Sequence, residues 1–73
     1  MFIITEVDST SIKSVAYDKE EEKLWLRFKS DALYEYRGVQ EQTVKELVTA
    51  ESKGKFFHEN IKNKFDYEKV EEE

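Results

Sequence analysis

Side chains that could carry out catalysis are scarce in this 73-residue chain. It contains one histidine, His58, and no cysteine, so it offers neither a nucleophile–base pair nor the ligand spacing of a metal site. The acidic runs 20–22 and 71–73 are contiguous, so their carboxylates diverge rather than converge on a metal ion. No glycine-rich loop is present that could hold a phosphate group. The sequence therefore predicts a protein that is not an enzyme and that uses no metal ion or small-molecule cofactor.

Aromatic side chains interleaved with cations are stronger candidates, for binding rather than catalysis. Trp25, Arg27 and Lys29 alternate with apolar residues, so in a strand they share one face, with Arg37 on the strand that follows. On such a face an unpaired base can stack on the indole ring while the cations meet phosphates. The alternative is an ordinary solvated face on which the arginine stems cover the Trp25 ring. The pattern leaves both interpretations open.

Tyr34 and Tyr36 are separated by one residue, which gives them a common face in a strand. Aromatic faces on a sheet stack unpaired bases, so the pair could form a base-stacking platform. The alternative is that both rings fill the core beside the apolar residues of the preceding strand. Because small domains depend heavily on buried aromatic area, we favour the core for both tyrosines.

The last part of the chain is locally basic before it becomes acidic. Its cations are Lys53, Lys55, Lys62 and Lys64, with His58 between them. These lysines could follow a phosphate backbone. They could equally be solvated residues near helix ends that suit the helix dipole, and lysine lacks the planar fork with which arginine binds phosphate. We favour the second interpretation.

Ser52 and Gly54 lie where one helix should end and another should begin. Free backbone N–H groups at such a point can bind an anion. A cap at Ser52 and a helix break at Gly54, with the glycine in the left-handed conformation, account for the same residues without any ligand. We favour the cap and the break.

The hydrophobic pattern indicates the elements that position these residues. A strand is expected over 12–18, with Val15 and Tyr17 on one face and Ile12 on the other, and a β-hairpin over 24–36 with its turn at 30–32. After Gly38 the period changes from two to 3.6, which predicts a helix over about 40–52 and a shorter one over about 55–62. A capping-box pattern at 43–46 would start the first helix one turn later.

These elements predict an α+β fold. We expect a three-stranded antiparallel β-meander with two C-terminal helices packed on one face. Residues 2–7 are either an extended lead-in or an additional N-terminal edge strand. Residues 1–65 form one domain in this interpretation. Residues 66–73 form an acidic, flexible tail, since they hold five acids and one base and contribute −4 of the net charge of −5.

Targeting signals are not evident in the sequence. The N-terminus lacks the basic flank and the length of a signal peptide. No apolar run approaches the ~20 residues needed to cross a bilayer. We therefore expect a cytoplasmic protein with no membrane partner.

With these residues placed, the chain resembles the KTSC domain family, which occurs at the C-terminus of some lysyl-tRNA synthetases and as a stand-alone small bacterial protein. The resemblance covers about residues 9–65 and rests on the order of its parts. Those parts are Ser11 and Ile12, Tyr17-Asp18, Leu24, Leu26 and Phe28, Tyr34-Glu35-Tyr36, Val39, Leu47, Ala50-Glu51-Ser52-Lys53-Gly54-Lys55-Phe56-Phe57 and Ile61. Among the residues that carry the resemblance, those expected to have a structural role are Tyr17, Tyr34, Tyr36, Ser52, Gly54 and Phe57. Two positions depart from the family pattern: Gln40 replaces a usual proline and Asp31 a usual glycine.

The resemblance implies a non-catalytic module with a suggested RNA-binding role. The first hypothesis is therefore weak, salt-sensitive RNA binding through Trp25, Arg27, Lys29, Arg37 and the lysines of the 53–64 segment. The alternative is a module that binds a larger protein, such as an adaptor or an inhibitor in a bacterial or phage setting, with Trp25 and the acidic tail as contacts. Steep weakening by salt would favour RNA, because phosphate contacts release counterions.

Overall fold

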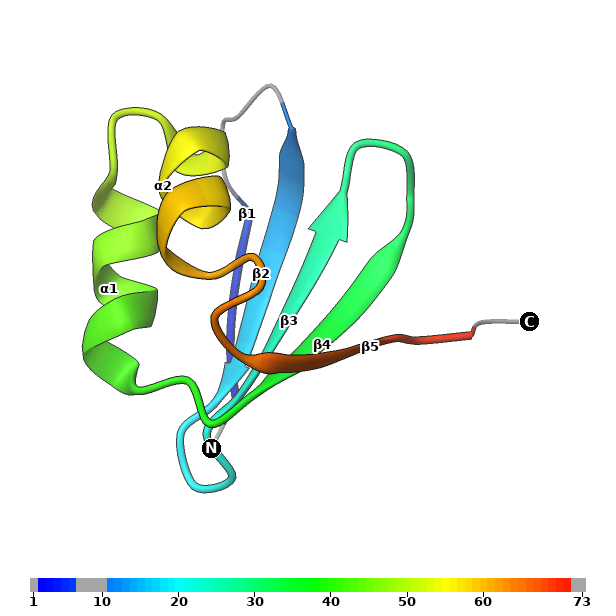
Figure 1. The fold of residues 1–73 in the computed structure, drawn as a ribbon, viewed down its shortest axis with the longest axis vertical. Helices are drawn as coiled ribbons and strands as arrows, with labels where there is room; N and C mark the ends of the chain where they lie inside the picture. Colours follow the sequence, from blue (N-terminus) through cyan, green and yellow to red (C-terminus); the bar gives the residue numbers. More distant parts are fainter. Residues whose placement is uncertain (1, 7–10, 72–73) are drawn as a thin grey trace.

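An antiparallel sheet of five strands forms one layer of the fold, and two helices form the other (Figure 1). The computed structural model describes residues 2–6, by their backbone alone, and residues 11–71. The strands are β1 (Phe2–Glu6), β2 (Ile12–Asp18), β3 (Lys23–Phe28), β4 (Leu33–Arg37) and β5 (Asp66–Lys69), in the spatial order β1-β2-β3-β4-β5. The expected α+β meander covered on one face by helices is confirmed, and the N-terminal segment is an edge strand rather than a lead-in.

The fifth strand corrects the prediction of a flexible tail that begins at residue 66. Asp66–Lys69 pairs antiparallel with β4, in a register that places Tyr67 opposite Tyr36 and Asp66 opposite Arg37. The ladder continues beyond the strand, because the Val70 N–H donates to the Leu33 carbonyl at 2.8 Å. All four residues of β5 are exposed, so backbone pairing and side-chain contacts at the edge hold this strand rather than burial of an apolar face.

A β-bulge corrects the predicted face of Ile12. The register between β2 and β3 shifts between Ile12 and Ser14, so that Ile12 lies opposite Phe28 while Ser14 lies opposite Arg27. The extra residue, Lys13, reverses the alternation locally. Ile12 therefore joins Val15 on the buried face of the sheet, and it is fully buried.

The core lies between the sheet and the helices and is built mainly from aliphatic side chains. Its buried members are Ile12, Val15, Tyr17, Leu24, Leu26, Tyr36, Val39, Val44, Leu47 and Ile61. Tyr17 is 1% exposed, and its hydroxyl donates to the Val39 carbonyl at 2.6 Å. This hydrogen bond ties β2 to the segment that leads into the first helix, and it satisfies a polar group that would be costly to bury alone.

Helix α1 (Glu41–Thr49) begins at the earlier of the two expected starts and ends before the expected residue 52. Gln40 is its N-cap, without a side-chain cap hydrogen bond, so the capping-box start at 43 is wrong. Ala50 has extended backbone (φ −66°, ψ 143°), which ends the helix. Val44 and Leu47 are the buried residues of its inner face.

Helix α2 (Lys53–Asn60) begins where the Ser52 hydroxyl accepts a hydrogen bond from the Lys55 N–H at 3.3 Å, so the favoured cap at Ser52 is confirmed. The predicted break at Gly54 is wrong, because Gly54 lies inside α2. A Cβ at this position would lie 3.0 Å from Ser11 Oγ. The glycine therefore permits α2 to approach the start of β2.

Gly38 is the glycine that requires a left-handed backbone, with φ of +77°. A Cβ placed there meets nothing within 4 Å, so the Gly38→Ala variant should be destabilised only by the positive φ that alanine would have to adopt. We expect the free energy of unfolding in urea to fall by about 1 kcal/mol. The matched variant Gly38→Asn should lose less, since asparagine adopts this conformation more readily. Equal stability of the alanine variant and the wild type would contradict this account.

Candidate functional site

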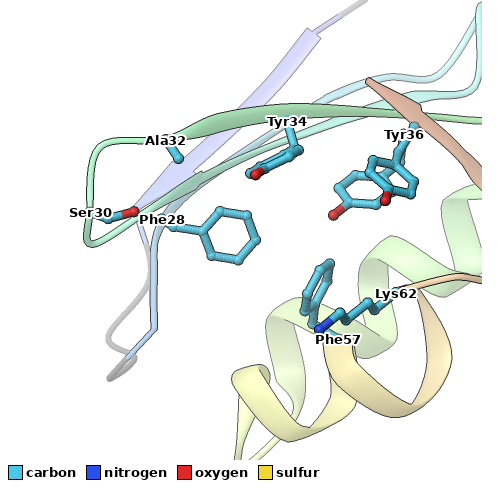
Figure 2. Close-up of a pocket in the computed structure, with 8 residues that line it drawn as sticks. Phe28, Ser30, Ala32, Tyr34, Tyr36, Phe57 and Lys62 are labelled. Carbon is cyan, nitrogen blue, oxygen red and sulfur yellow. The ribbon is translucent and has the colours of Figure 1, made fainter. Parts of the chain in front are cut away.

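An open pocket of about 360 Å³ lies where β3, β4 and β5 meet α2, on the helix side of the sheet (Figure 2). Five of the residues that line it are aromatic, and we call it the aromatic pocket. Its lining residues are Phe28, Ser30, Ala32, Tyr34, Tyr36, Phe57, Lys62 and Tyr67. Alternation explains its composition: Tyr34 and Tyr36 share the inner face of β4, and the register of β5 places Tyr67 on that face as well.

Four of the rings form a closed circuit of contacts around the pocket. Phe28 meets Tyr34 at a centroid distance of 5.7 Å and Phe57 at 5.3 Å, both edge to face. Tyr36 meets Phe57 at 5.6 Å and Tyr34 at 6.5 Å. These separations lie in the range of favourable aromatic pairs. Figure 2 shows the labelled rings gathered around one space rather than spread along the sheet.

Tyr67 extends this circuit toward solvent. Its ring stacks on Tyr36 at 5.6 Å with an angle of 29° between the planes, and it lies 6.2 Å from Tyr34. Tyr67 is nevertheless 51% exposed, the one large hydrophobic residue that is exposed among those whose burial the structure describes. The pocket therefore presents an accessible aromatic surface supported by a packed one.

Tyr36 is the most buried aromatic residue of the pocket, with 4% of its surface exposed. Burial, reinforced by the neighbouring Tyr34 and Tyr67, raises the pKa of Tyr36 to about 12. The Tyr36 hydroxyl therefore stays protonated at neutral pH, so it can both donate and accept a hydrogen bond. The preference for a core position is thus confirmed for Tyr36, whereas Tyr34 is half-buried and lines the pocket.

The charge of the aromatic pocket is positive. Of the described residues that line it, Lys62 alone is charged, and its side chain lies beside Phe57 in Figure 2. Lys55, Lys62 and Lys64 are exposed, and no ion pair between described residues involves any of the three. Lys53 differs, because its Nζ donates to the Ala50 carbonyl at 3.0 Å.

The opposite face of the sheet carries Trp25, as the sequence predicted. The half-buried Trp25 lies between Ala16 on β2 and Glu35 on β4. Beside it is a shallow hollow of about 310 Å³ lined by Ser14, Ala16, Trp25, Arg27 and Leu33. One terminal nitrogen of Arg27 donates to the Asp31 carbonyl at 2.9 Å, which directs this guanidinium toward the hairpin turn.

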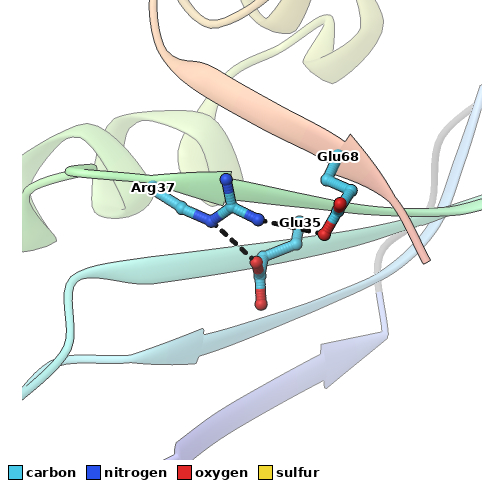
Figure 3. A network of polar contacts seen from close by, with 3 residues as sticks. All are labelled: Glu35, Arg37 and Glu68. Carbon is cyan, nitrogen blue, oxygen red and sulfur yellow. Dashed lines mark hydrogen bonds and ion pairs between the residues drawn. The ribbon is translucent and has the colours of Figure 1, made fainter.

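Arg37 forms ion pairs with two carboxylates on this outer face. Its Nε lies 3.0 Å from Glu35 Oε2, and its terminal nitrogen lies 3.1 Å from Glu68 Oε2 (Figure 3). Both partners compete with any phosphate for the same guanidinium. Lys29 is exposed in the turn that follows β3. The outer face therefore alternates charges of both signs rather than presenting a continuous cationic surface.

The residues predicted to form one RNA-binding surface lie on two different sides of the molecule. Trp25, Arg27 and Arg37 lie on the outer face of the sheet, whereas the lysines of the 53–64 segment lie on or after α2 on the helix side. The aromatic pocket itself was not predicted, because Tyr67 was assigned to a tail. The alternation of the aromatic Phe65 and Tyr67 with the acidic Asp66 and Glu68 was a signal that could have revealed β5.

Within residues 2–6 and 11–71, no group of three or more His, Cys, Asp or Glu side chains is placed to hold a metal ion. No helix among these residues is long and apolar enough to cross a membrane.

Comparison with known proteins identifies the family. The sequence model of the KTSC domain family matches residues 8–65 of this chain. A lysine–tRNA ligase of Trichormus variabilis is 36% identical over 69 residues, which cover 94% of this chain and 12% of the ligase. An uncharacterized protein of Stutzerimonas stutzeri is 38% identical over 56 residues, 77% of this chain and 79% of that protein. The chain thus spans about one eighth of the length of the ligase that it matches.

A solved structure agrees with this assignment. The crystal structure of a KTSC domain protein from Yersinia pestis superimposes with a TM-score of 0.91 at 34% sequence identity, over 97% of this chain and 100% of that one. The fold and the sequence thus point to the same relatives. This chain belongs to the KTSC domain family.

Proposed function

We propose that this protein is a non-catalytic module that binds single-stranded RNA weakly on its helix side. The observation that carries the proposal is an open aromatic pocket with Lys62 at its edge. Unpaired bases stack on aromatic side chains, and lysines nearby meet the phosphates that connect those bases. Lys55 and Lys64 extend the same side of the molecule with exposed ammonium groups.

Two further considerations support RNA as the ligand class. The matching segment of the Trichormus variabilis relative belongs to a lysine–tRNA ligase, an enzyme whose name states that it acts on an RNA. In addition, the lysines of the helix side have no carboxylate partner among the described residues, in contrast to Arg37. The net charge of −5 opposes long-range attraction, so we expect low affinity.

Amide chemical shifts of the labelled protein titrated with a short single-stranded RNA would test the proposal. We expect shifts at Phe57, Lys62 and Tyr67 in about 50 mM salt, fading at about 200 mM because counterions are released on binding. Lys62→Gln should lower the slope of log affinity against log salt by about 1, whereas Lys45→Gln, an exposed lysine on α1, should leave it unchanged. A spectrum unmoved by RNA at low salt would reject RNA binding.

A protein partner is the second candidate, and the outer face favours it. The half-buried Trp25 beside a hollow, with Arg37 held between Glu35 and Glu68, resembles the mixed charges around an aromatic anchor at a protein interface. Such binding should depend little on salt, because its centre is apolar. Shifts that cluster at Trp25 with an added protein, and persist at high salt, would support this candidate.

A further inference from the structure

The aromatic pocket is an open recess in the surface rather than a packing defect inside the core. Here a space of about 360 Å³ stays open beside rings that contact one another, and an exposed tyrosine forms its outer wall. The volume lies at the lower end of the range of roughly 300–1,000 Å³ that small-ligand sites occupy.

The lining residues distinguish between possible ligands. Aromatic walls attract cations as well as flat rings, but the Lys62 ammonium group in the pocket repels a cation. The same ammonium group attracts an anion. A ligand that suits both the walls and the charge is a planar aromatic ring that carries a negative group a short distance away. A nucleotide has this chemistry: a base that can stack and a phosphate that can meet a lysine.

We infer that the aromatic pocket is a nucleotide subsite, in which one unpaired base stacks against Tyr67 and the rings beside it while its phosphate meets Lys62. This inference rests on the proposed RNA-binding function and specifies where on the molecule a nucleotide binds. It places the base between the sheet and α2, and it makes β5 a part of the site because β5 supplies Tyr67. Tyr34 and Tyr36 line the pocket, and we expect their hydroxyl groups to hydrogen-bond to the base edge.

Two RNA hexamers of the same length separate this subsite from general phosphate binding. One carries all its bases, and the other is abasic at every position but keeps the ribose–phosphate backbone. We expect the wild-type protein to bind the intact hexamer roughly 5- to 150-fold more tightly, which corresponds to the stacking of one base. With the intact hexamer, the largest amide shifts should occur at Tyr67 and Phe57. With the abasic hexamer, amide shifts should occur only at the lysines.

Variants of Tyr67 test the stacking directly, because this side chain is half exposed and lies outside the buried core cluster. Tyr67→Ala should lose most of the preference for the intact hexamer, and Tyr67→Phe should keep it. Equal affinity of the wild type for the two hexamers would overturn the subsite while leaving RNA binding in place. If the wild type binds neither hexamer at low salt, the proposed function fails and the subsite with it.

Discussion

Replacing Ile61 with alanine is expected to lower the free energy of unfolding by about 3 kcal/mol. Ile61 is fully buried, and its N–H donates to the Phe57 carbonyl at 2.9 Å at the end of α2. Its side chain joins the core cluster that includes Leu24, Leu47 and Tyr36. Truncation would remove its apolar contacts and leave a cavity between α2 and the sheet, which the surrounding structure can fill only in part.

The size of this loss matters because small domains have little stability to spare. At roughly 0.05–0.15 kcal/mol per residue, a chain of this length is stable by about 4–11 kcal/mol. Urea unfolding of Ile61→Ala beside Ile61→Val would measure the effect, and the valine variant should lose only about 0.5–1.5 kcal/mol. Similar losses for both variants would show that the position is not tightly packed.

Raising the pH above 10 is expected to destabilise the folded protein through its core tyrosines. Burial raises the pKa of Tyr36 to about 12 and also raises the pKa of Tyr17, whose shift is reinforced by nearby carboxylates. The unfolded state loses these protons near pH 10, while the folded state keeps them. The unfolded state therefore binds fewer protons in this window, so stability falls as the pH rises.

The expected contribution of Tyr36 is a loss of about 2 kcal/mol between pH 10 and pH 12, with little change below about pH 9. Free energies of unfolding in urea at pH 8, 10 and 11.5 would measure it. The variant Tyr36→Phe has no proton to lose at this site, so its stability should fall less over the same range. A parallel fall in both proteins would assign the alkaline sensitivity to other groups.

Much of the fold could be predicted from the sequence, because its periodicity is locally clear. The hairpin strands alternate apolar and polar residues, and Val44 and Leu47 mark the inner face of α1. The misassigned positions depend on contacts between distant residues. The bulge at Lys13 reverses the face of Ile12 without a sequence signal, and Gly54 is required by the approach of Ser11 rather than by a helix end.

The candidate site was harder to predict than the fold, because it depends on which strands become neighbours. Asp66 to Lys69 is rich in charge, and charged segments are typical of tails. Only pairing with β4 brings Tyr67 onto Tyr36 and Glu68 onto Arg37. Composition drew attention to Trp25 and the lysines, but it could not reveal that they lie on different sides of the molecule.

The position of β5 in the chain also has a consequence for the order of folding. The pairs β2–β3 and β3–β4 are joined by short connections, whereas α1 and α2 separate β4 from β5. Closing a longer connection carries a larger entropic cost, so we expect β5 to dock after the meander and the helices have formed. A strand with four exposed residues also gains little when it docks, so it should open at a lower free energy than the rest of the sheet. The wall that carries Tyr67 would then be the last part of the pocket to assemble and the first to open.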